Sequence, residues 1–440
     1  MKILEYINKK AFIFKDFLIV SFLTGLITGG LVTLFLYLCE IFTNFIFKGN
    51  PWETIENLPK IYVILIPIIA ILFVNLIIYF DKSVKVYGVV QIADIVQKNE
   101  DFITLKSLIL KLLASVISIS SGFAVGTEGP SAEIGAMVAV QLEKFFSIPE
   151  KFLKVIISVG ASSGIAAVFV SPITGIVFAI ESIAYEFFQN YIIFIMVGAF
   201  SAFSISVMFF PAIGFLSPSG RFLNYDYIWL MAFFIPFMTF LIYFYLTLQD
   251  KILLIFKFKI FEKFGRFSQL IFALTGGLFI GIILLIDPRA AFTGHNIVEI
   301  LFNEFQNIPF KIIILILFLR IFATTISNYS NAIGGMFLPL MSIGALGGYG
   351  FGEAVQALHL VQIQPYYFAA IGAAVFMGVL MKLPFTAVVL ALEITNDYNV
   401  VLATGFGVGV IMYITKLKFN LKKLNTLNID FSEIIHFKKK

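Results

Sequence analysis

The chain has 440 residues, of which 60% are hydrophobic and 13% charged, and its formal net charge is +5. Soluble domains have about 45–50% apolar and about 25% charged residues, so this composition excludes a soluble protein and indicates a membrane protein. Cys39 is the only cysteine and the three histidines are scattered, so we expect no disulfide framework, no metal site and no cofactor. The positive charge requires no nucleic acid partner, because an anionic lipid surface is enough to explain it.

Several apolar runs are long enough to cross a bilayer as helices. The run 17–39 contains no charged residue, and neither does the run 61–80. Each has the roughly 20 residues that a transmembrane helix needs. Further long runs cover residues 191–216, 227–248, 267–286 and 311–327. The sequence therefore predicts an all-α membrane protein with many spans.

Other apolar pieces are short, or are interrupted by glycine, proline or a charged residue. They cover residues 107–125, 130–142, 155–170, 173–180, 337–350, 367–381, 384–392 and 400–415. Irregular backbone at membrane depth is tolerated only where it is buried in protein or lines a cavity. We therefore expect the interrupted pieces in the interior, around a site.

Both ends of the chain are basic. Lys9, Lys10 and Lys15 precede the first long run, and residues 438–440 are all lysine. Since cytoplasmic segments are enriched in lysine and arginine, we expect both termini in the cytoplasm. The first run is too long for the apolar region of a cleavable signal peptide. A composition rich in Phe, Ile and Lys indicates an AT-rich bacterial genome, and hence a bacterial inner membrane.

The chain contains an internal repeat. Residues 172–181 and 384–393 both read P-x-T-x-[IV]-V-[FL]-A-[IL]-E, and residues 130–136 and 339–345 both read P-x-x-x-I-G-A. The two matches occur in the same order and at nearly one offset, which indicates two structurally related halves. Paired halves with interrupted apolar segments at corresponding places are typical of transporters, whose binding site lies between the halves.

Each half has a Gly-Pro break that is typical of a loop followed by a helix start. The first is Gly126-Thr127-Glu128-Gly129-Pro130, and residues 334–339 (GGMFLP) form its counterpart. Glycine permits close approach, and proline suits the first helical turn. A helix start offers unpaired N–H groups and a partial positive charge, so two facing starts would form an anion site. The alternative is a pair of simple kinks between packed helices.

The residue types in these breaks favour an anion over a cation. A cation site needs several carboxylates or amides, whereas the second break has none and the first has only Glu128. When ionised, a lone carboxylate among N–H groups is a tethered substitute anion that blocks the site. When protonated, it leaves, and an anion enters. Glu128 is therefore interpreted as a gate and a proton carrier.

With these motifs, the chain resembles the CLC family of chloride channels and proton-coupled chloride antiporters, in its prokaryote-like form without CBS domains. The resemblance extends from about residue 17 to 416. The family motif G-[KR]-E-G-P is matched at 126–130, and G-G-x-F-x-P is matched at 334–339. Further family motifs are matched at 160–169, 172–181 and 384–393.

The resemblance implies a homodimer in lipid, with one anion pathway per subunit and two inverted halves in each. We expect a single transmembrane domain over 1–440, with halves at 17–217 and 227–416 and a short basic cytoplasmic tail at 417–440.

The resemblance also implies the site residues. Glu128 matches the family's gating glutamate. Backbone N–H groups from Gly126 to Gly129, and those of Met336 and Phe337, match its anion contacts. Lys111, Arg320 and Lys382 occupy basic positions of the family.

The chain departs from the family at two anion ligands. The motif G-S-G-I-P would fall at 86–90, where only Gly88 is kept and Tyr87 replaces the serine. The family's second hydroxyl ligand, a tyrosine after the last helix, has no match. Since tyrosine keeps an O–H donor, we expect Tyr87 to supply the phenol from the opposite side of the anion. The alternative is an aromatic residue at the membrane interface. Thr127 replaces a basic residue, which predicts a weaker attraction for anions.

The proton pathway departs as well. Ser182 stands where the antiporters carry an internal proton-transfer glutamate. Glu181, one position earlier, is a substitute proton donor or a structural residue. Glu133 is an unusual acid for a membrane helix, and it either carries protons or contacts Lys111 or a polar cavity.

Three functions therefore stay open, none of them enzymatic. The protein is expected to be a proton/chloride antiporter that uses Glu128. The alternative is a passive chloride channel gated by Glu128, and the third is an anion sensor or scaffold that transports nothing. Chloride is the expected anion, with other halides and nitrate as alternatives because Tyr87 alters the site.

Overall fold

The computed structural model describes residues 2–85, 104–146, 148–149, 152–184, 188–210, 225–257, 268–302, 308–359 and 364–418. Within these ranges the chain is helical and forms no β-strand, apart from one isolated bridge between Gly126 and Gly335. The all-α prediction is therefore confirmed. Tyr87 and Gly88 lie outside the described residues.

Among the described residues, seven helices are long and apolar enough to cross a membrane. They are α1 (Lys2–Phe47), α3 (Lys60–Phe80), α9 (Phe188–Ser206), α10 (Met231–Lys257), α11 (Ser268–Ile286), α13 (Phe310–Tyr329) and α17 (Asn399–Lys418). Each predicted long run overlaps one of them, and the piece 400–415, expected to be short, belongs to the 20-residue α17. The run 191–216 ends as a helix at Ser206.

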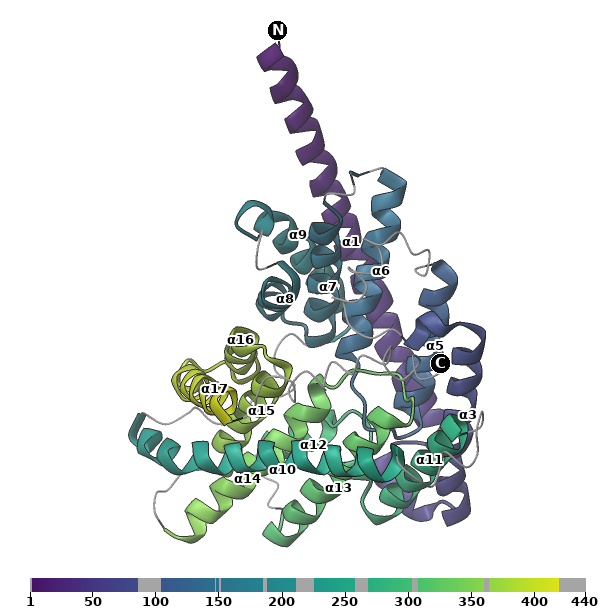
Figure 1. The fold of residues 1–440 in the computed structure, drawn as a ribbon, viewed down its shortest axis with the longest axis vertical. Coiled ribbons are helices and arrows are strands. Elements are labelled where there is room, and N and C mark those ends of the chain that lie inside the picture. The colour runs from purple at the N-terminus through teal and green to yellow at the C-terminus, as the bar shows by residue number, and fades with distance from the viewer. Residues whose placement is uncertain are drawn as a thin grey trace, which may run out of the picture.

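The interrupted pieces form shorter or buried helices. They are α5 (Leu105–Ser120), α6 (Glu128–Phe146), α7 (Leu153–Phe169), α8 (Pro172–Ala179), α12 (His295–Phe302), α14 (Phe337–Ala357), α15 (Pro365–Met381) and α16 (Pro384–Thr395). In Figure 1, α6 to α9 lie beside α1 in the upper part of the view, α15 to α17 lie in the lower left above α10, and α14 extends below α10.

Several described helices of the two halves correspond in pairs. Helix α6 begins at Glu128 and α14 at Phe337, which are 209 residues apart (128 to 337). Helices α7 and α15 have the same length of 17 residues. Both end at a residue in the left-handed region, Val170 with φ 51° and Lys382 with φ 59°, before a proline begins the next helix. The repeat in the sequence is thus a repeat of structure.

Within each half, two helices approach at glycines. A Cβ on Gly135 of α6 would lie 2.0 Å from the carbonyl oxygen of Gly160 on α7. In the second half, a Cβ on Gly344 of α14 would lie 2.2 Å from the carbonyl oxygen of Gly372 on α15. No side chain fits at these four points, so glycine sets the spacing of both pairs.

Each half also caps a helix of the other. Glu181, after α8, accepts hydrogen bonds from the N–H groups of Phe385 (3.0 Å) and Thr386 (2.9 Å) at the start of α16. Glu393, near the end of α16, accepts from the Thr174 N–H (2.8 Å) at the start of α8. Each acid lies at the end of its own helix and caps the start of the other helix. The end of α8 is therefore next to the start of α16, and the reverse also holds, so α8 and α16 run antiparallel. The halves are therefore inverted, as predicted.

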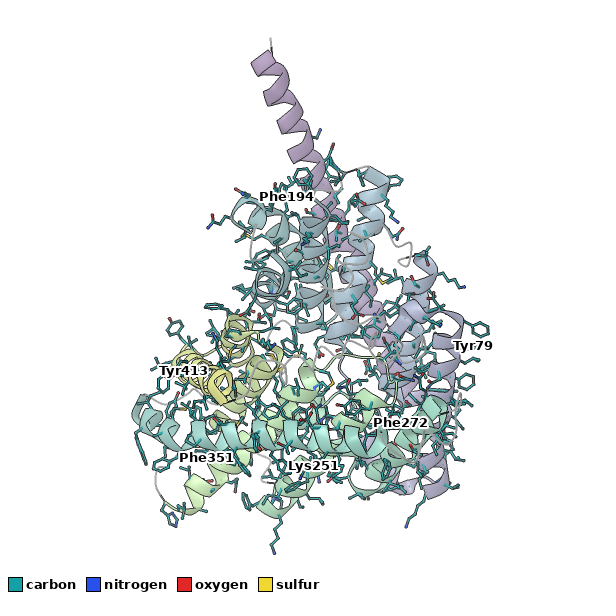
Figure 2. The ribbon with its side chains drawn as sticks, viewed as in Figure 1. Tyr79, Phe194, Lys251, Phe272, Phe351 and Tyr413 are labelled. Carbon is teal, nitrogen blue, oxygen red and sulfur yellow. The ribbon has the colours of Figure 1, made fainter. Side chains whose placement is uncertain are left out.

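The side chains on the outer surface are largely apolar. Phe45 on α1 and Phe240 on α10 are more than half exposed, as is Phe385 at the start of α16. Tyr79 on α3 and Tyr413 on α17 are also exposed, and they lie at opposite edges of the molecule (Figure 2). Large exposed apolar surface of this extent is typical of a protein that is surrounded by lipid.

Candidate functional site

The two broken segments meet at their glycines. The N–H of Gly126 donates to the carbonyl of Gly335 at 2.6 Å, and the N–H of Gly335 donates to the carbonyl of Gly126 at 2.7 Å. A Cβ on Gly129 would lie only 2.9 Å from the Cα of Gly335. These close approaches bring the starts of α6 and α14 together between the two halves, as the motif analysis predicted.

Two serines hold the segments that lead into these helix starts. The N–H of Ala124 donates to Ser327 Oγ on α13 (2.8 Å), and the N–H of Ile333 donates to Ser118 Oγ on α5 (2.9 Å). All four residues are buried. Each half therefore provides a hydrogen-bond acceptor for a buried backbone N–H of the other half. A buried N–H without such a partner would be destabilising. Sequence reasoning missed these serines, although the offset of 209 residues (118 to 327) relates them.

Glu128 lies across this junction. Its side chain is 1% exposed. Oε2 accepts a long hydrogen bond from the N–H of Leu338 (3.5 Å), in the first turn of α14, and Oε1 accepts from Thr127 Oγ1 (3.4 Å). A carboxylate is stabilised by the partial positive charge of a helix start. Glu128 thus occupies a place between the two starts that suits an anion.

Thr127, Met336 and Phe337 are predicted anion contacts that lie next to the two helix starts in the chain. Thr127 is buried beside the Glu128 carboxylate, and Met336 precedes the first residue of α14, Phe337. The Phe337 ring packs against Phe169 at the end of α7, with 5.1 Å between the ring centroids. The first N–H groups of a helix have no partner within it. Those of α6 and α14 are therefore the donors that the site offers.

Two details differ from the sequence prediction. The N–H of Gly126 is used by Gly335, so it belongs to the junction and is not a free donor for an anion. The N–H of Leu338, which the prediction omitted, is the one that contacts the Glu128 carboxylate. The residue types gave no signal for Leu338, because any residue provides a backbone donor.

Arg320 is a buried base whose side chain contacts α14. It is fully buried on α13, and its Nε donates to Ser342 Oγ on α14 (2.8 Å). One terminal nitrogen, Nη1, donates to the carbonyls of Ala291 (2.6 Å) and Phe292 (2.8 Å), in the segment between α11 and α12. Through Ser342, Arg320 is joined to the beginning of α14, where the Leu338 N–H contacts the Glu128 carboxylate.

Lys111 lies at the corresponding place in the first half. Its Nζ forms a buried ion pair with Glu133, five residues beyond Glu128 on α6. The structure therefore has the contact that the sequence analysis gave as one alternative for Glu133. The ion pair joins α5 to α6 and gives Glu133 a structural contact.

Glu181 and Ser182 lie in the short segment after α8. Glu181 caps α16, with Oε2 also accepting from Thr386 Oγ1 at 2.7 Å. The Ser182 hydroxyl donates to the Phe178 carbonyl of its own helix at 2.6 Å. The contacts of both residues therefore lie at α8 and α16, and not at the junction that holds Glu128. Tyr87 and Gly88, outside the described residues, stay predictions.

No group of three or more His, Cys, Asp or Glu side chains is placed to hold a metal ion in the part of the chain that the structure describes. The residues described at this junction are backbone donors, the Glu128 carboxylate and the buried bases Lys111 and Arg320.

The chain is similar in sequence to known proteins. The family model described as voltage gated chloride channel matches residues 68–416. The H(+)/Cl(-) exchange transporter ClcA of Vibrio cholerae is 28% identical over 312 residues, a match that covers 67% of this chain and 63% of that protein. The ClcA of Citrobacter koseri is 27% identical over 306 residues, covering 67% and 62%. The chain thus spans somewhat less than two thirds of the length of these relatives.

Solved structures share the fold. A slow cyanobacterial Cl-/H+ antiporter aligns with a TM-score of 0.77 at 21% identity, over 94% of this chain and 99% of its own. A CLC-type fluoride/proton antiporter aligns with a TM-score of 0.73 at 20% identity, over 92% and 96%. With the family model covering most of the sequence, this integral, multi-pass membrane protein belongs to the voltage-gated chloride channel family.

Proposed function

We propose that this protein moves chloride across a membrane in exchange for protons, with Glu128 as the gate and the external proton site. The observation that carries the proposal is the position of the Glu128 carboxylate, between two facing helix starts and within reach of the Leu338 N–H. The relatives named above are H(+)/Cl(-) exchange transporters, and two structures with the same fold are proton antiporters. Both facts support exchange over simple conduction.

The geometry supports a competition between the carboxylate and the anion. While Glu128 is ionised, it fills the place between the helix starts, and a second negative charge is repelled. A proton from the outside neutralises the carboxylate and weakens its attraction to the N–H groups and to Arg320. An incoming anion then displaces it. One side chain in this way links the entry of an anion to the uptake of a proton.

The passive channel is the alternative that one observation favours. Ser182 stands at the position of the internal proton-transfer glutamate, and its hydroxyl is bonded to its own helix. A serine holds no titrating proton, so protons would have to reach Glu128 from the cytoplasm through water. A channel needs no such route, and Glu128 would then act only as a gate. A sensor or scaffold would bind an anion without moving it.

Reconstitution separates these functions. Purified protein in liposomes is given an outward chloride gradient, and the membrane voltage is clamped by valinomycin and potassium. An antiporter moves protons in the direction opposite to the chloride flux, so outward chloride flux drives protons into the liposomes, even against their own gradient, and reversing the chloride gradient reverses the proton movement. Fast chloride flux without proton movement would establish the channel. The absence of any anion flux would leave only the sensor. Repeating the assay with fluoride, bromide and nitrate determines the anion.

We also propose the assembly and the placement that the family resemblance implies. The protein is a homodimer in the bacterial inner membrane, with one pathway per subunit and both termini in the cytoplasm. The halves 17–217 and 227–416 and the tail 417–440 form a single domain. Exposed apolar residues on α16 and α17, such as Phe385 and Phe406, support a face that is covered by lipid or by a second copy. Single-molecule photobleaching in liposomes counts the subunits, and one-step bleaching throughout would contradict the dimer.

A further inference from the structure

Two basic side chains are buried at equivalent places in the two halves. Lys111 lies on α5 and Arg320 on α13, at the same offset of 209 residues (111 to 320) that relates the two helix starts. Both side chains are buried. Such charges within a membrane protein need partners, and they act strongly on any ion nearby, because the surrounding dielectric constant is low.

The partners of the two bases differ in charge. Lys111 forms an ion pair with Glu133 on α6, and both side chains are 4% exposed. The equivalent of Glu133 in the second half is Ser342 on α14, whose hydroxyl accepts from Arg320 Nε at 2.8 Å. The remaining contacts of Arg320 are backbone carbonyls, among them that of Thr293 (2.5 Å). The first base is thus paired with a carboxylate, whereas the second is held by neutral oxygens.

Because the contacts of Arg320 are neutral oxygens, its positive charge is not cancelled by them and can act on Glu128. Arg320 contacts Ser342, four residues beyond Leu338 on α14, and the Leu338 N–H contacts the Glu128 carboxylate at the proposed anion position. The charge of Lys111 is opposed by Glu133, which is five residues, or about 7.5 Å along the helix axis, from Glu128. Beside the gate, Thr127 adds no charge. In the part of the site that the structure describes, we therefore assign the positive potential to Arg320 and to the two helix starts.

We propose that Glu133 sets the anion affinity of the site by neutralising Lys111, and that Arg320 is the buried charge that holds the anion. This inference rests on the proposed anion transport and adds a residue that determines its affinity. By cancelling one of two buried positive charges, Glu133 weakens the hold on the anion, and a weakly held anion leaves sooner. The pair Lys111–Glu133 acts through charge and does not touch the anion.

The second half provides the design of the experiment. Lys111→Arg combined with Glu133→Ser transplants the arrangement of Arg320 and Ser342 into the first half. It adds one net positive charge, and arginine keeps its proton in a buried site. Lys111→Met combined with Glu133→Gln is the matched control, because it also removes the ion pair but leaves the net charge unchanged. A packing effect is common to both variants, whereas a charge effect separates them.

The measurement is chloride binding to the purified proteins by isothermal titration calorimetry. A unit charge about 10–15 Å from the anion changes binding on the order of tenfold at the effective dielectric constant of proteins. We therefore expect the Arg–Ser variant to bind chloride about tenfold more tightly than the Met–Gln variant. Its turnover in liposomes should be slower at saturating chloride, since release is delayed.

The outcomes distinguish this inference from the proposed function. Equal affinities of the two variants, with chloride binding and flux intact in the unmodified protein, overturn the role of Glu133 and leave anion transport standing. No chloride binding or flux in the unmodified protein overturns the proposed function itself. Should the Arg–Ser variant fail to fold, Glu133→Gln alone replaces it, and it is again expected to bind chloride more tightly than the Met–Gln variant. Loss of proton movement in Glu133→Gln without a change in affinity would instead identify a proton carrier.

Discussion

The two halves of the molecule have the same frame but carry different side chains at the site. At the first residue of the inner helix, the first half has Glu128 and the second has Phe337. Five residues further on, the first half has Glu133 and the second has Ser342. Both carboxylates that face the interior near the junction therefore belong to one half. The helices that form the frame are thus related by the repeat, whereas the negative charges near the junction are found in the first half.

Positions at which both halves have the same residue type connect the two halves. Ser118 and Ser327 each bind a backbone N–H of the opposite half, and Glu181 and Glu393 each cap a helix of the opposite half. These residues hold the halves together, and a two-fold arrangement needs them twice. The comparison teaches that matched residues maintain the frame and unmatched residues determine what passes through it.

The largest expected effect comes from removing the unmatched carboxylate at the helix start. Glu128→Gln keeps the shape of the side chain but carries neither a negative charge nor a proton. We expect proton movement in the liposome assay to fall below detection while chloride flux continues. Glu40→Gln, an exposed carboxylate on α1, is the matched control and keeps its coupling. Normal proton pumping by Glu128→Gln would show that the asymmetry at the helix starts has no function.

The next largest effect concerns the caps between α8 and α16. Glu393 is buried and accepts from Ser171, from the Thr174 N–H and from the Thr174 hydroxyl, whereas Glu181 is only half-buried. Hydrogen bonds to a charged group contribute about 1.5–3 kcal/mol, and exposure reduces them. We expect Glu393→Ala to lower the free energy of unfolding by about 3 kcal/mol and Glu181→Ala by about 1.5 kcal/mol. Urea titration in mild detergent measures both.

The same pair of variants decides between two interpretations of Glu181. As a cap, its loss reduces stability and leaves proton coupling intact. As a substitute proton donor, its loss abolishes coupling in the liposome assay with little change in stability. The second pattern would place Glu181 on the proton route and would make α8 functionally different from α16.

The two serines should have equal and smaller effects. Ser118→Ala leaves the buried N–H of Ile333 without a partner, and Ser327→Ala does the same for Ala124. An unsatisfied buried donor costs about 1–3 kcal/mol, so we expect each variant to lose about 2 kcal/mol of stability. Because the contacts are equivalent, a difference of more than about 1 kcal/mol between them would break the symmetry of the frame.

The smallest effect on stability is expected from two hydroxyls on the same two helices, α5 and α13, that make no hydrogen bond. Ser115 on α5 and Thr324 on α13 are buried, and their hydroxyls have no hydrogen-bond partner among the described residues. Removing a buried hydroxyl that makes no bond is neutral or slightly stabilising. Ser115→Ala and Thr324→Val should therefore change the free energy of unfolding by less than about 0.5 kcal/mol. They serve as controls for Ser118 and Ser327, which are three residues further along each helix.

Much of the fold and the centre of the site could be predicted from the sequence, because the signals are local. Apolar runs predicted the helices, and Gly-Pro breaks predicted the starts of α6 and α14 with Glu128 between them. The repeat predicted two related halves. Each of these depends on residues that are close together in the chain, or on a pattern that recurs.

The remaining parts depend on contacts between distant residues, for which a single sequence gives no sign. Glu181 has its partner 205 residues away in Thr386, so its position alone did not distinguish a cap from a proton donor. Arg320 holds carbonyls of the segment between α11 and α12, and any residue type provides a carbonyl. Glu133 was left with two interpretations, because the distance to Lys111 is set by how α5 packs on α6.

The paired hydrogen bonds of Gly126 and Gly335 also constrain how the site can move. The two bonds join single residues, one just before α6 and one just before α14. Pulling the two helix starts apart would break both bonds at once and leave two N–H groups and two carbonyls without these partners. The junction therefore resists separation of the halves at this point more than a single contact would.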